Sequence, residues 1–253
     1  MKLDNMIPKG HPRYYSLLFR EKIVNAYKSG VLADAGMIAH GRGEAFDYLI
    51  GEKTSQTAEK SIEAAAATLL LAENPVISVN GNTAALVSSE IVELTHSLNA
   101  KIEINLFYRT DKRVEAILKL LKKAGAKEVL GTNREKMKHI NGLEHARGDV
   151  SLDGIFKADV ILVPLEDRDG TEKLVQSGKL VISIDLNPLS RTSKKSSITI
   201  VDNITRAIPL LIKKVDELKK KDEKEIQKIK DNFNNNKNLK ESLKVILDSI
   251  NHM

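Results

Sequence analysis

Short runs of β-branched and aliphatic residues alternate with longer stretches of helical periodicity through the middle of this chain. An apolar run bounded by polar residues predicts a buried strand, and apolar residues three and four positions apart predict a helix. Strands are expected at 76–79, 102–107, 160–163, 181–184 and 198–201, and helices at 83–99, 111–124, 171–177 and 203–218. The alternation predicts an α/β fold with a mostly parallel sheet that helices cover on both faces. A shorter run at 127–130 is a candidate for one more strand.

Both flanks of this core have a helical pattern. Residues 1–73 carry a helix from about 14 to 29, which Gly30 is placed to end, and another from 58 to 73 with an alanine-rich centre. Residues 213–253 form a Lys-rich helical tail, which asparagines at 234–236 divide into two helices. We expect a single domain over 1–253, in which a helical N-terminal segment (1–73) precedes the core that contains the strands (74–212) and the tail (213–253).

Polar side chains directly follow the last two predicted strands. The strand at 181–184 leads into Asp-Leu-Asn-Pro-Leu-Ser-Arg-Thr at 185–192, and the strand at 198–201 leads into Asp202 and Asn203. Because ligands of open parallel sheets bind beyond the carboxyl ends of the strands, we expect these groups to form one site. A mixture of carboxylate, amide, hydroxyl and guanidinium groups suits phosphate and ribose.

The composition narrows the class of protein without naming a reaction. The chain has no Cys and no apolar run long enough to cross a bilayer, so we expect a cytoplasmic protein without disulfides or a membrane partner. Half of the net charge of +6 arises in the tail, where 11 Lys alternate with 8 acidic residues. Because only 4% of residues are aromatic and no nucleic-acid motif occurs, binding to nucleic acid is not expected.

Gly41 and Gly43 flank Arg42 and allow the backbone to approach a ligand closely. They predict a glycine turn that binds an anion, with a helix-initiating turn and an exposed Arg42 as the alternative. The segment is not a dinucleotide fingerprint, since Phe46 stands where the third glycine belongs, and the chain has no Walker A sequence. The adjacent His40 is a candidate base or phosphate donor, although a lone His is more often structural.

The residues show no spacing typical of a protein-ligated metal, and none is expected. Glu166, Asp167 and Asp169 are candidates for Mg²⁺ that a nucleotide brings, with acidic residues of a solvated loop as the alternative. No pattern marks a covalent nucleophile. The residues alone predict a phosphate-binding edge and leave the reaction open.

Six blocks, at 7–13, 38–52, 76–82, 105–110, 163–167 and 185–191, carry a family resemblance. They include Ile38-Ala39-His40-Gly41-Arg42-Gly43-Glu44-Ala45-Phe46-Asp47-Tyr48 and Asp185-Leu186-Asn187-Pro188-Leu189-Ser190-Arg191. In these blocks the chain resembles archaeal phosphopantothenate synthetase, also called 4-phosphopantoate–β-alanine ligase, and the similarity runs from about residue 7 to about residue 210. Two positions depart from the family pattern: Gly10 stands where Ser is usual, and Arg168 and Gly170 have changed places.

The resemblance implies a Rossmann-like homodimer that joins 4-phosphopantoate to β-alanine with ATP on the archaeal route to coenzyme A. Such a ligase releases AMP and pyrophosphate through an acyl-adenylate, with Mg²⁺ carried by the ATP. The ATP contacts that it implies are Arg20, Arg42, Asp185, Leu186, Asn187, Arg191, Thr192, Asn203 and Ile204. The alternatives are a non-catalytic nucleotide-binding or sensing module of the same fold and a ligase for another small acid.

The phosphate and carboxylate of 4-phosphopantoate require positive charge beyond what ATP uses, and amide groups to orient the hydroxyl. His40, Asn80, Asn82 and Arg109 lie at the glycine turn and at two other strand ends, and they are the candidate contacts. Arg109 suits a bidentate grip on an anion, with a surface residue that begins a helix as the alternative. The apolar faces of the N-terminal helices also favour a homodimer.

Overall fold

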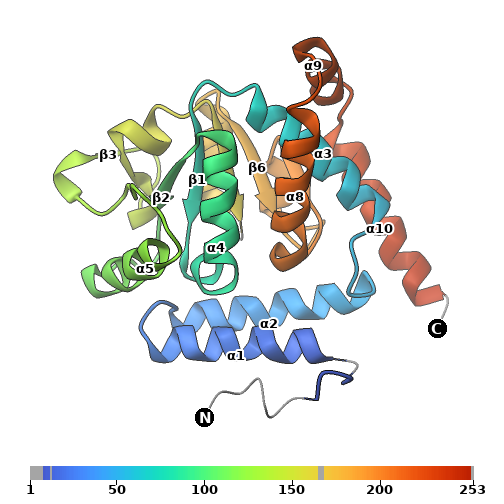
Figure 1. Cartoon of the computed structure of the whole chain (residues 1–253), viewed down its shortest axis with the longest axis horizontal. Coiled ribbons are helices and arrows are strands. Elements are labelled where there is room, and N and C mark those ends of the chain that lie inside the picture. The colour runs from blue at the N-terminus through green and yellow to red at the C-terminus, as the bar shows by residue number, and fades with distance from the viewer. Residues whose placement is uncertain (1–7, 12, 165–167, 252–253) are drawn as a thin grey trace.

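A five-stranded parallel sheet lies at the centre of the computed structural model (Figure 1). The structure describes residues 8–11, 13–164 and 168–251. Neighbouring strands follow the order β2-β1-β5-β6-β7, and every pair is parallel. The strands are β1 (Pro75–Val79), β2 (Lys101–Ile104), β5 (Val160–Pro164), β6 (Leu180–Ile184) and β7 (Ile198–Ile200). All five lie where the apolar runs predicted strands, although β2 ends early, and the predicted α/β fold class is confirmed.

The chain reverses its direction of travel across the sheet between β1 and β5. It moves from β1 to β2 on one side, and β5, β6 and β7 follow in turn on the other side. At the reversal, the Asn80 Nδ2 donates a hydrogen bond of 3.0 Å to the carbonyl oxygen of Pro164. Connections that diverge from two adjacent strand ends leave a crevice beyond the sheet, where ligands of such folds bind.

Alternate side chains of the strands point into two separate apolar cores, as a period of two requires. Ile77 and Ile182 belong to the larger core. It is covered by α3 (Gln56–Leu70), α4 (Gly81–Leu98), α5 (Asp111–Lys123) and α8 (Ile204–Leu218). Val76 and Val181 belong to the smaller core on the opposite face, which α6 (Arg168–Gln176) covers together with the segment that precedes β5. The prediction that both faces are covered is confirmed.

An antiparallel hairpin of β3 (Met137–His139) and β4 (Asp149–Ser151), which the sequence pattern did not reveal, precedes β5. Short 3-10 turns lie at Arg134–Lys136 and Ala146–Gly148, and a π-helical turn lies at Leu152–Phe156. The additional strand expected at 127–130 is wrong. Leu130 forms only an isolated bridge to Glu103, because Gly131, with φ of 77°, turns the chain away from the sheet.

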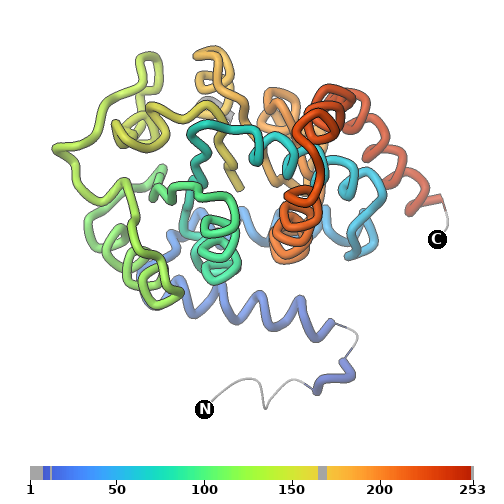
Figure 2. The backbone as a smooth tube through the Cα atoms, turned by 45° about the horizontal axis from the view of Figure 1, so that its top comes forward, coloured from blue at the N-terminus to red at the C-terminus, as the bar shows by residue number. Residues whose placement is uncertain are grey.

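Helices α1 (Tyr14–Lys28) and α2 (Asp34–Leu49) form a separate layer across the carboxyl ends of the strands. They are the lowest helices in Figure 1, and Figure 2 shows α1 as the outermost element on that side. The predicted limits of the first helix are confirmed, and Gly30 ends it with φ of 76°.

Helix α2 corrects the prediction of a glycine turn. Gly41 and Gly43 lie inside a continuous helix, so Arg42 projects from a helix surface and not from a loop. A Cβ at Gly36 in the same helix would lie 2.6 Å from Leu32 Cδ1, and one at Gly43 would lie 3.5 Å from Leu186 Cδ1. The glycines lower the helix propensity but let α2 approach its neighbours closely, and the sequence pattern showed only the first effect.

The predicted break in the tail is confirmed, with α9 (Glu223–Asp231) before it and α10 (Asn235–Asn251) after it. Asn235 ties the tail to the core: its Oδ1 accepts a 2.8 Å hydrogen bond from Thr199 N, and its Nδ2 donates to the carbonyl oxygens of Ser193 and Ser196 at 3.0 Å. Farther along, Ile246 packs against Ile50 and Leu186. Among the described helices, none combines the length and the apolar character needed to span a membrane.

Glu103, on β2, joins the hairpin region to the sheet from a fully buried position of 0% exposure. Its Oε1 accepts a 2.8 Å hydrogen bond from Ser151 N, and its Oε2 accepts one of 2.7 Å from Ile155 N. Burial raises the pKa of the Glu103 carboxyl to about 7, against the opposing effect of these two hydrogen bonds. A folded-state pKa above the unfolded value means that the group stabilises the fold at low pH and that this stability is lost as the pH rises through about 7.

We predict that Glu103→Gln weakens this pH dependence. The variant loses one acceptor for a buried N–H, which costs about 1–3 kcal/mol, but it carries no carboxyl to ionise. The difference in unfolding free energy between wild type and variant, measured in urea at several pH values, should therefore shrink between about pH 5 and about pH 8. Glu93→Gln, at an exposed position of α4, is the control and should leave the profile unchanged. A difference that stays constant with pH would contradict the prediction.

Candidate active site

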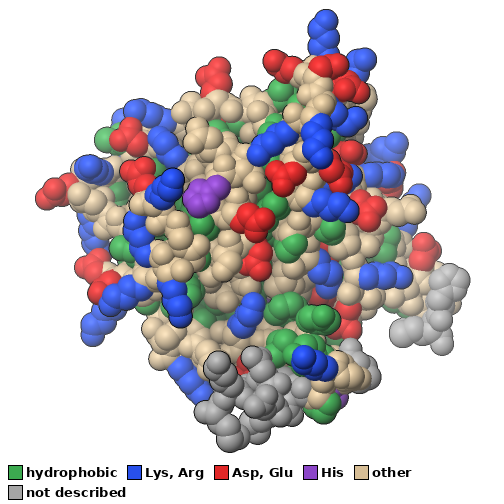
Figure 3. Space-filling model, viewed as in Figure 1, with side chains coloured by type: hydrophobic (Ala, Val, Ile, Leu, Met, Phe, Trp, Pro, Cys, Tyr) green, Lys and Arg blue, Asp and Glu red, His purple; other side chains and the backbone are tan. Residues whose placement is uncertain are grey.

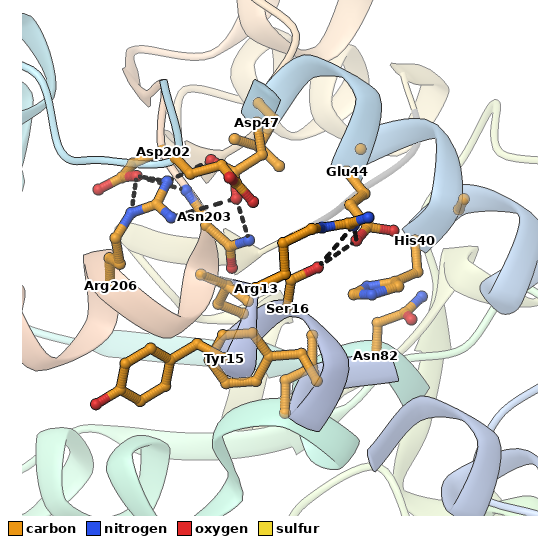
Figure 4. Close-up of a pocket in the computed structure, with 17 residues that line it drawn as sticks. Arg13, Tyr15, Ser16, His40, Glu44, Asp47, Asn82, Asp202, Asn203 and Arg206 are labelled. Carbon is orange, nitrogen blue, oxygen red and sulfur yellow. Dashed lines mark hydrogen bonds and ion pairs between the residues drawn. The ribbon is translucent and has the colours of Figure 1, made fainter. Parts of the chain in front are cut away.

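A pocket of about 200 Å³ lies between the N-terminal helices and the carboxyl ends of the strands. Figure 4 shows polar side chains from both sides pointing into it. Helices α1 and α2 form one wall, and the start of α4, Leu186 from the loop after β6 and the start of α8 form the other. The lining residues are Arg13, Tyr15, Ser16, Phe19, Ala39, His40, Gly43, Glu44, Asp47, Glu52, Asn82, Leu86, Leu186, Asp202, Asn203, Ile204 and Arg206. The functional edge predicted from the strand ends therefore coincides with a pocket.

The chain after β6 forms a loop that is held by hydrogen bonds between its own residues and those of α7 (Arg191–Lys195), into which it leads. Asp185 Oδ1 accepts a 2.9 Å hydrogen bond from Asn187 N, and its Oδ2 accepts one of 2.5 Å from Ser190 Oγ. Ser193 Oγ donates to the carbonyl oxygen of Asn187 at 2.8 Å. These bonds fix the loop before any ligand binds, which lowers the cost of ordering it around one.

Burial raises the pKa of the Asp185 carboxyl, while the hydrogen bonds from Ser190 and Asn187 and the charge of Arg42 act in the opposite direction. Arg42 lies on α2, so this electrostatic contact joins the N-terminal layer to the loop. Arg191 is exposed at the start of α7, and Thr192 beside it is buried. The loop thus presents one exposed cation on a rigid support.

At the end of β7, one guanidinium binds two buried carboxylates. Arg206 contacts Asp47 Oδ1 at 2.5 Å and Asp202 Oδ1 at 2.6 Å. Asn203 Nδ2 donates to Asp47 Oδ2 at 2.7 Å, and Thr54 Oγ1 donates to Asp202 Oδ2 at 2.6 Å. Burial raises the pKa of Asp202, against the opposing effect of Arg206. This network joins α2 to the start of α8 and fixes the amide of Asn203 at the pocket wall.

A second ion cluster joins α1 to α2 around Glu44. The Arg20 Nε donates to both Glu44 oxygens at 2.9 and 3.1 Å, and Ser16 Oγ donates at 2.6 Å. Arg13 adds a hydrogen bond of 3.3 Å to Glu44 and one to the Tyr48 hydroxyl. Burial alone would raise the pKa of Glu44, but the hydrogen bonds from Arg20 and Ser16 outweigh it and lower the pKa. Glu44 is therefore a carboxylate that holds two guanidinium groups at the pocket mouth.

His40 of α2 and Asn82 of α4 lie near each other, at the end of the pocket away from Asp202 and Arg206 (Figure 4). Burial lowers the pKa of the His40 imidazole, and the charge of Glu44 offsets this only partly. Asn82 is 8% exposed, and its buried Oδ1 has no hydrogen-bond partner among the described residues. A buried carbonyl oxygen without a partner is costly, so it marks a place where a ligand donor fits.

Five of the thirteen residues that the sequence singled out line the pocket: Leu186, Asn203, Ile204, His40 and Asn82. Five others do not line it: Arg42 lies on α2, Asp185 and Asn187 lie in the loop after β6, and Arg191 and Thr192 lie on α7. Arg20 reaches the pocket only through Glu44. Asp47, Arg206 and Glu44 were missed. The signal for Arg206 was its place in the first turn of α8, directly after the polar strand end.

Two other predicted contacts lie elsewhere. Asn80 is buried as the N-cap of α4, with its Oδ1 accepting a hydrogen bond from Thr83 N. Arg109 lines a separate pocket of about 390 Å³ with Arg134, His139 and Asp149, and donates a 2.7 Å hydrogen bond to the Gly131 carbonyl oxygen. Within one chain, Arg109 therefore does not share the pocket of His40.

The described residues contain no group of three or more His, Cys, Asp or Glu side chains arranged to hold a metal ion. Glu166 and Asp167, proposed above for Mg²⁺, lie outside the described residues, and the side chain of Asp169 does too.

Comparison with known proteins gives a consistent family. The phosphopantothenate/pantothenate synthetase profile matches residues 57–249. A 4-phosphopantoate–β-alanine ligase of Thermococcus kodakarensis is 54% identical over 248 residues, covering 98% of this chain and 94% of the relative. Ligases of the same name from Thermococcus onnurineus and Methanosarcina mazei are 56% and 51% identical, covering 96% and 98% of this chain and 93% and 96% of the relatives. This chain therefore belongs to the phosphopantothenate/pantothenate synthetase family.

Proposed function

We propose that this chain is a 4-phosphopantoate–β-alanine ligase of coenzyme A biosynthesis. It would form an amide bond between 4-phosphopantoate and β-alanine at the expense of ATP, and release 4′-phosphopantothenate, AMP and pyrophosphate. The observation that carries the proposal is the identity of 54% over nearly the whole length of a relative with this name. The pocket at the carboxyl edge of the sheet supports it, because it gathers anion-binding and hydrogen-bonding groups in one place.

In this proposal, ATP binds across the ends of β6 and β7. Asp185 or Asn187 lies near the ribose or the adenine edge, and Arg191 near the phosphates. Arg20, Arg42, Leu186, Thr192, Asn203 and Ile204 complete the proposed ATP contacts. The internal hydrogen bonds of the loop and the anchored amide of Asn203 support this placement, since they hold these groups without a ligand.

A carboxylate is a poor electrophile, so the acid must first become a mixed anhydride with AMP. Guanidinium groups stabilise the charge that develops on the α-phosphate, and Mg²⁺ bound to the ATP phosphates would add to this effect. The amine of β-alanine then attacks the acyl-adenylate, and its placement alone contributes up to ~7–11 kcal/mol in the best cases. This route requires no covalent protein nucleophile.

The proposed contacts with 4-phosphopantoate are His40, Asn80, Asn82 and Arg109. Only His40 and Asn82 line the pocket. Asn80 supports the start of α4, where Asn82 lies, and its contribution would be to position that turn. Arg109 lies in the second pocket, so a contact through Arg109 requires a ligand that extends there or a second copy of the chain.

The assay that tests the function measures AMP and pyrophosphate in the presence of ATP, 4-phosphopantoate and β-alanine. Formation of AMP and of pyrophosphate should require both 4-phosphopantoate and β-alanine. AMP formation with a different acid, and none with 4-phosphopantoate, would indicate a ligase for another substrate. ATP binding without AMP formation under any of these conditions would indicate a non-catalytic nucleotide-binding module.

We predict that Arg191→Ala weakens ATP binding by roughly 1.5–3 kcal/mol, the usual value of a hydrogen bond to a charged group. Calorimetry with ATP measures the change directly. Lys194→Ala is the matched control, because it removes an exposed cation from the same short helix. If both variants bind ATP like the wild type, Arg191 is not a phosphate contact.

The exposed apolar side chains of α1 and α2 support the expectation of a homodimer. Tyr15 and Ile38 are 71% and 73% exposed, and Tyr27, Tyr108 and Phe107 are exposed as well. In Figure 3, hydrophobic side chains gather at the lower edge of the molecule, over the N-terminal layer of Figure 1. Large apolar side chains grouped in this way are typical of a protein–protein interface.

Light scattering at micromolar concentration should therefore give about twice the 28.1 kDa mass of one chain. Ile38→Glu should shift the mass toward one chain, because it buries a charge in the proposed interface. Leu247→Glu, at an exposed position of α10, should keep the larger mass. A wild-type mass near that of one chain would contradict the proposal.

A further inference from the structure

The imidazole of His40 is the pocket group whose chemistry the ATP site does not explain. It lines the pocket, yet within the described chain no side chain or backbone group forms a hydrogen bond with either ring nitrogen. The neighbouring Asn82 Oδ1 is buried and equally without a partner. Two acceptors that point into one pocket and lack donors fit a ligand group that carries several N–H bonds.

Three of the four carboxylates that line the pocket are engaged, and the fourth, Glu52, is exposed beyond the end of α2. Glu44 accepts hydrogen bonds from Arg13, Arg20 and Ser16. Asp47 and Asp202 share the guanidinium of Arg206. A carboxylate paired with a guanidinium is a weak base, because taking up a proton would cost it the ion pair. An unpaired carboxylate is in general a weaker base than an imidazole. Among the described lining residues, His40 is therefore the group best able to take up a proton.

We propose that His40 is the general base of the amide-forming step and that Asn82 Oδ1 positions the amine of β-alanine. This inference rests on the proposed function, and it assigns His40 and Asn82 to β-alanine in place of the contacts with 4-phosphopantoate proposed above. An aliphatic ammonium such as that of Lys has a pKa of about 10.4, so β-alanine reaches the pocket protonated and cannot attack. Its ammonium donates one hydrogen bond to Asn82 Oδ1 and gives one proton to the imidazole of His40.

The bonds and protons of the step balance as follows. The free amine nitrogen attacks the acyl carbon, the C–N bond forms, and the bond from that carbon to the phosphate oxygen of AMP breaks with its electron pair. The nitrogen loses a second proton to solvent as the amide forms, and the imidazolium of His40 returns its proton to solvent after AMP leaves. No oxidant, reductant or further reactant is needed.

The surroundings of His40 keep the imidazole in the form that this role requires. Burial lowers its pKa below the usual value of 6.5, and the charge of Arg20 acts in the same direction. Glu44 and Asp47, on the same helix, act in the opposite direction but are themselves paired with arginines. A neutral imidazole at neutral pH accepts a proton, whereas an imidazolium would repel the ammonium.

The test compares two nucleophiles in His40→Gln. Glutamine keeps the size and polarity of the side chain but cannot take up a proton. Product formation with β-alanine at neutral pH should fall by ~10²–10⁴-fold, the usual contribution of a general base. Hydroxylamine is unprotonated at neutral pH, so its trapping of the acyl-adenylate as a hydroxamate should continue at close to the wild-type rate. His96→Gln, at an exposed position near the other end of α4, is the matched control and should behave like the wild type in both reactions.

The pH dependence provides a second readout, which damage to the fold would not produce. Raising the pH supplies free β-alanine amine, so the rate of His40→Gln with β-alanine should rise about tenfold for each pH unit below the amine pKa. The wild-type rate should change far less. Asn82→Ala should raise the KM for β-alanine and leave hydroxamate formation intact.

Equal loss of both reactions in His40→Gln, or an unchanged rate with β-alanine, would overturn the proposal. If the proposed function itself were wrong, the result would differ from both of these outcomes. The wild-type protein would then form neither AMP with 4-phosphopantoate nor any hydroxamate.

Discussion

The pocket depends on one shared guanidinium. Arg206 binds Asp47 from α2 and Asp202 from the end of β7, and so fastens the N-terminal helical layer to the sheet. The arrangement costs desolvation of three charges, and removing the guanidinium would leave two carboxylates without a cation in the interior. Because α2 also carries His40 and Glu44, its position over the strand ends decides whether the two walls of the pocket face each other.

The sequence predicted the positions of the five sheet strands well, because the pattern that marks each strand lies within the strand itself. Each strand is a continuous apolar run, and the change from buried to polar at each strand end is visible without a partner. The order of the strands was not predicted, because the alternation of strands with helices does not determine which strands pair. Asp185 and Asn203 follow two strands that are adjacent in the sheet; they were expected at one edge, and they lie there.

The wall of the pocket formed by α1 and α2 depends on contacts between residues far apart in the sequence, which no local pattern predicts. Asp47 and Arg206 are 159 positions apart, and Glu44 is 24 positions from Arg20. Each looks like an ordinary charged residue of a solvated helix until the two helices are placed together. Gly43 misled for a related reason: without the neighbouring Leu186, a glycine that allows close packing looks like part of a turn.

The tail shows how a segment without any motif is tied to a site that it does not touch. Asn235 binds the backbone of β7 and of the residues that precede it, and Ile246 packs against Leu186. A chain shortened to residue 234 would keep every side chain that lines the pocket and still lose the attachment of α7. In the design of expression plasmids, crystallisation variants or C-terminal fusions, the last helix therefore has to be handled together with the loop after β6 and not as a removable end.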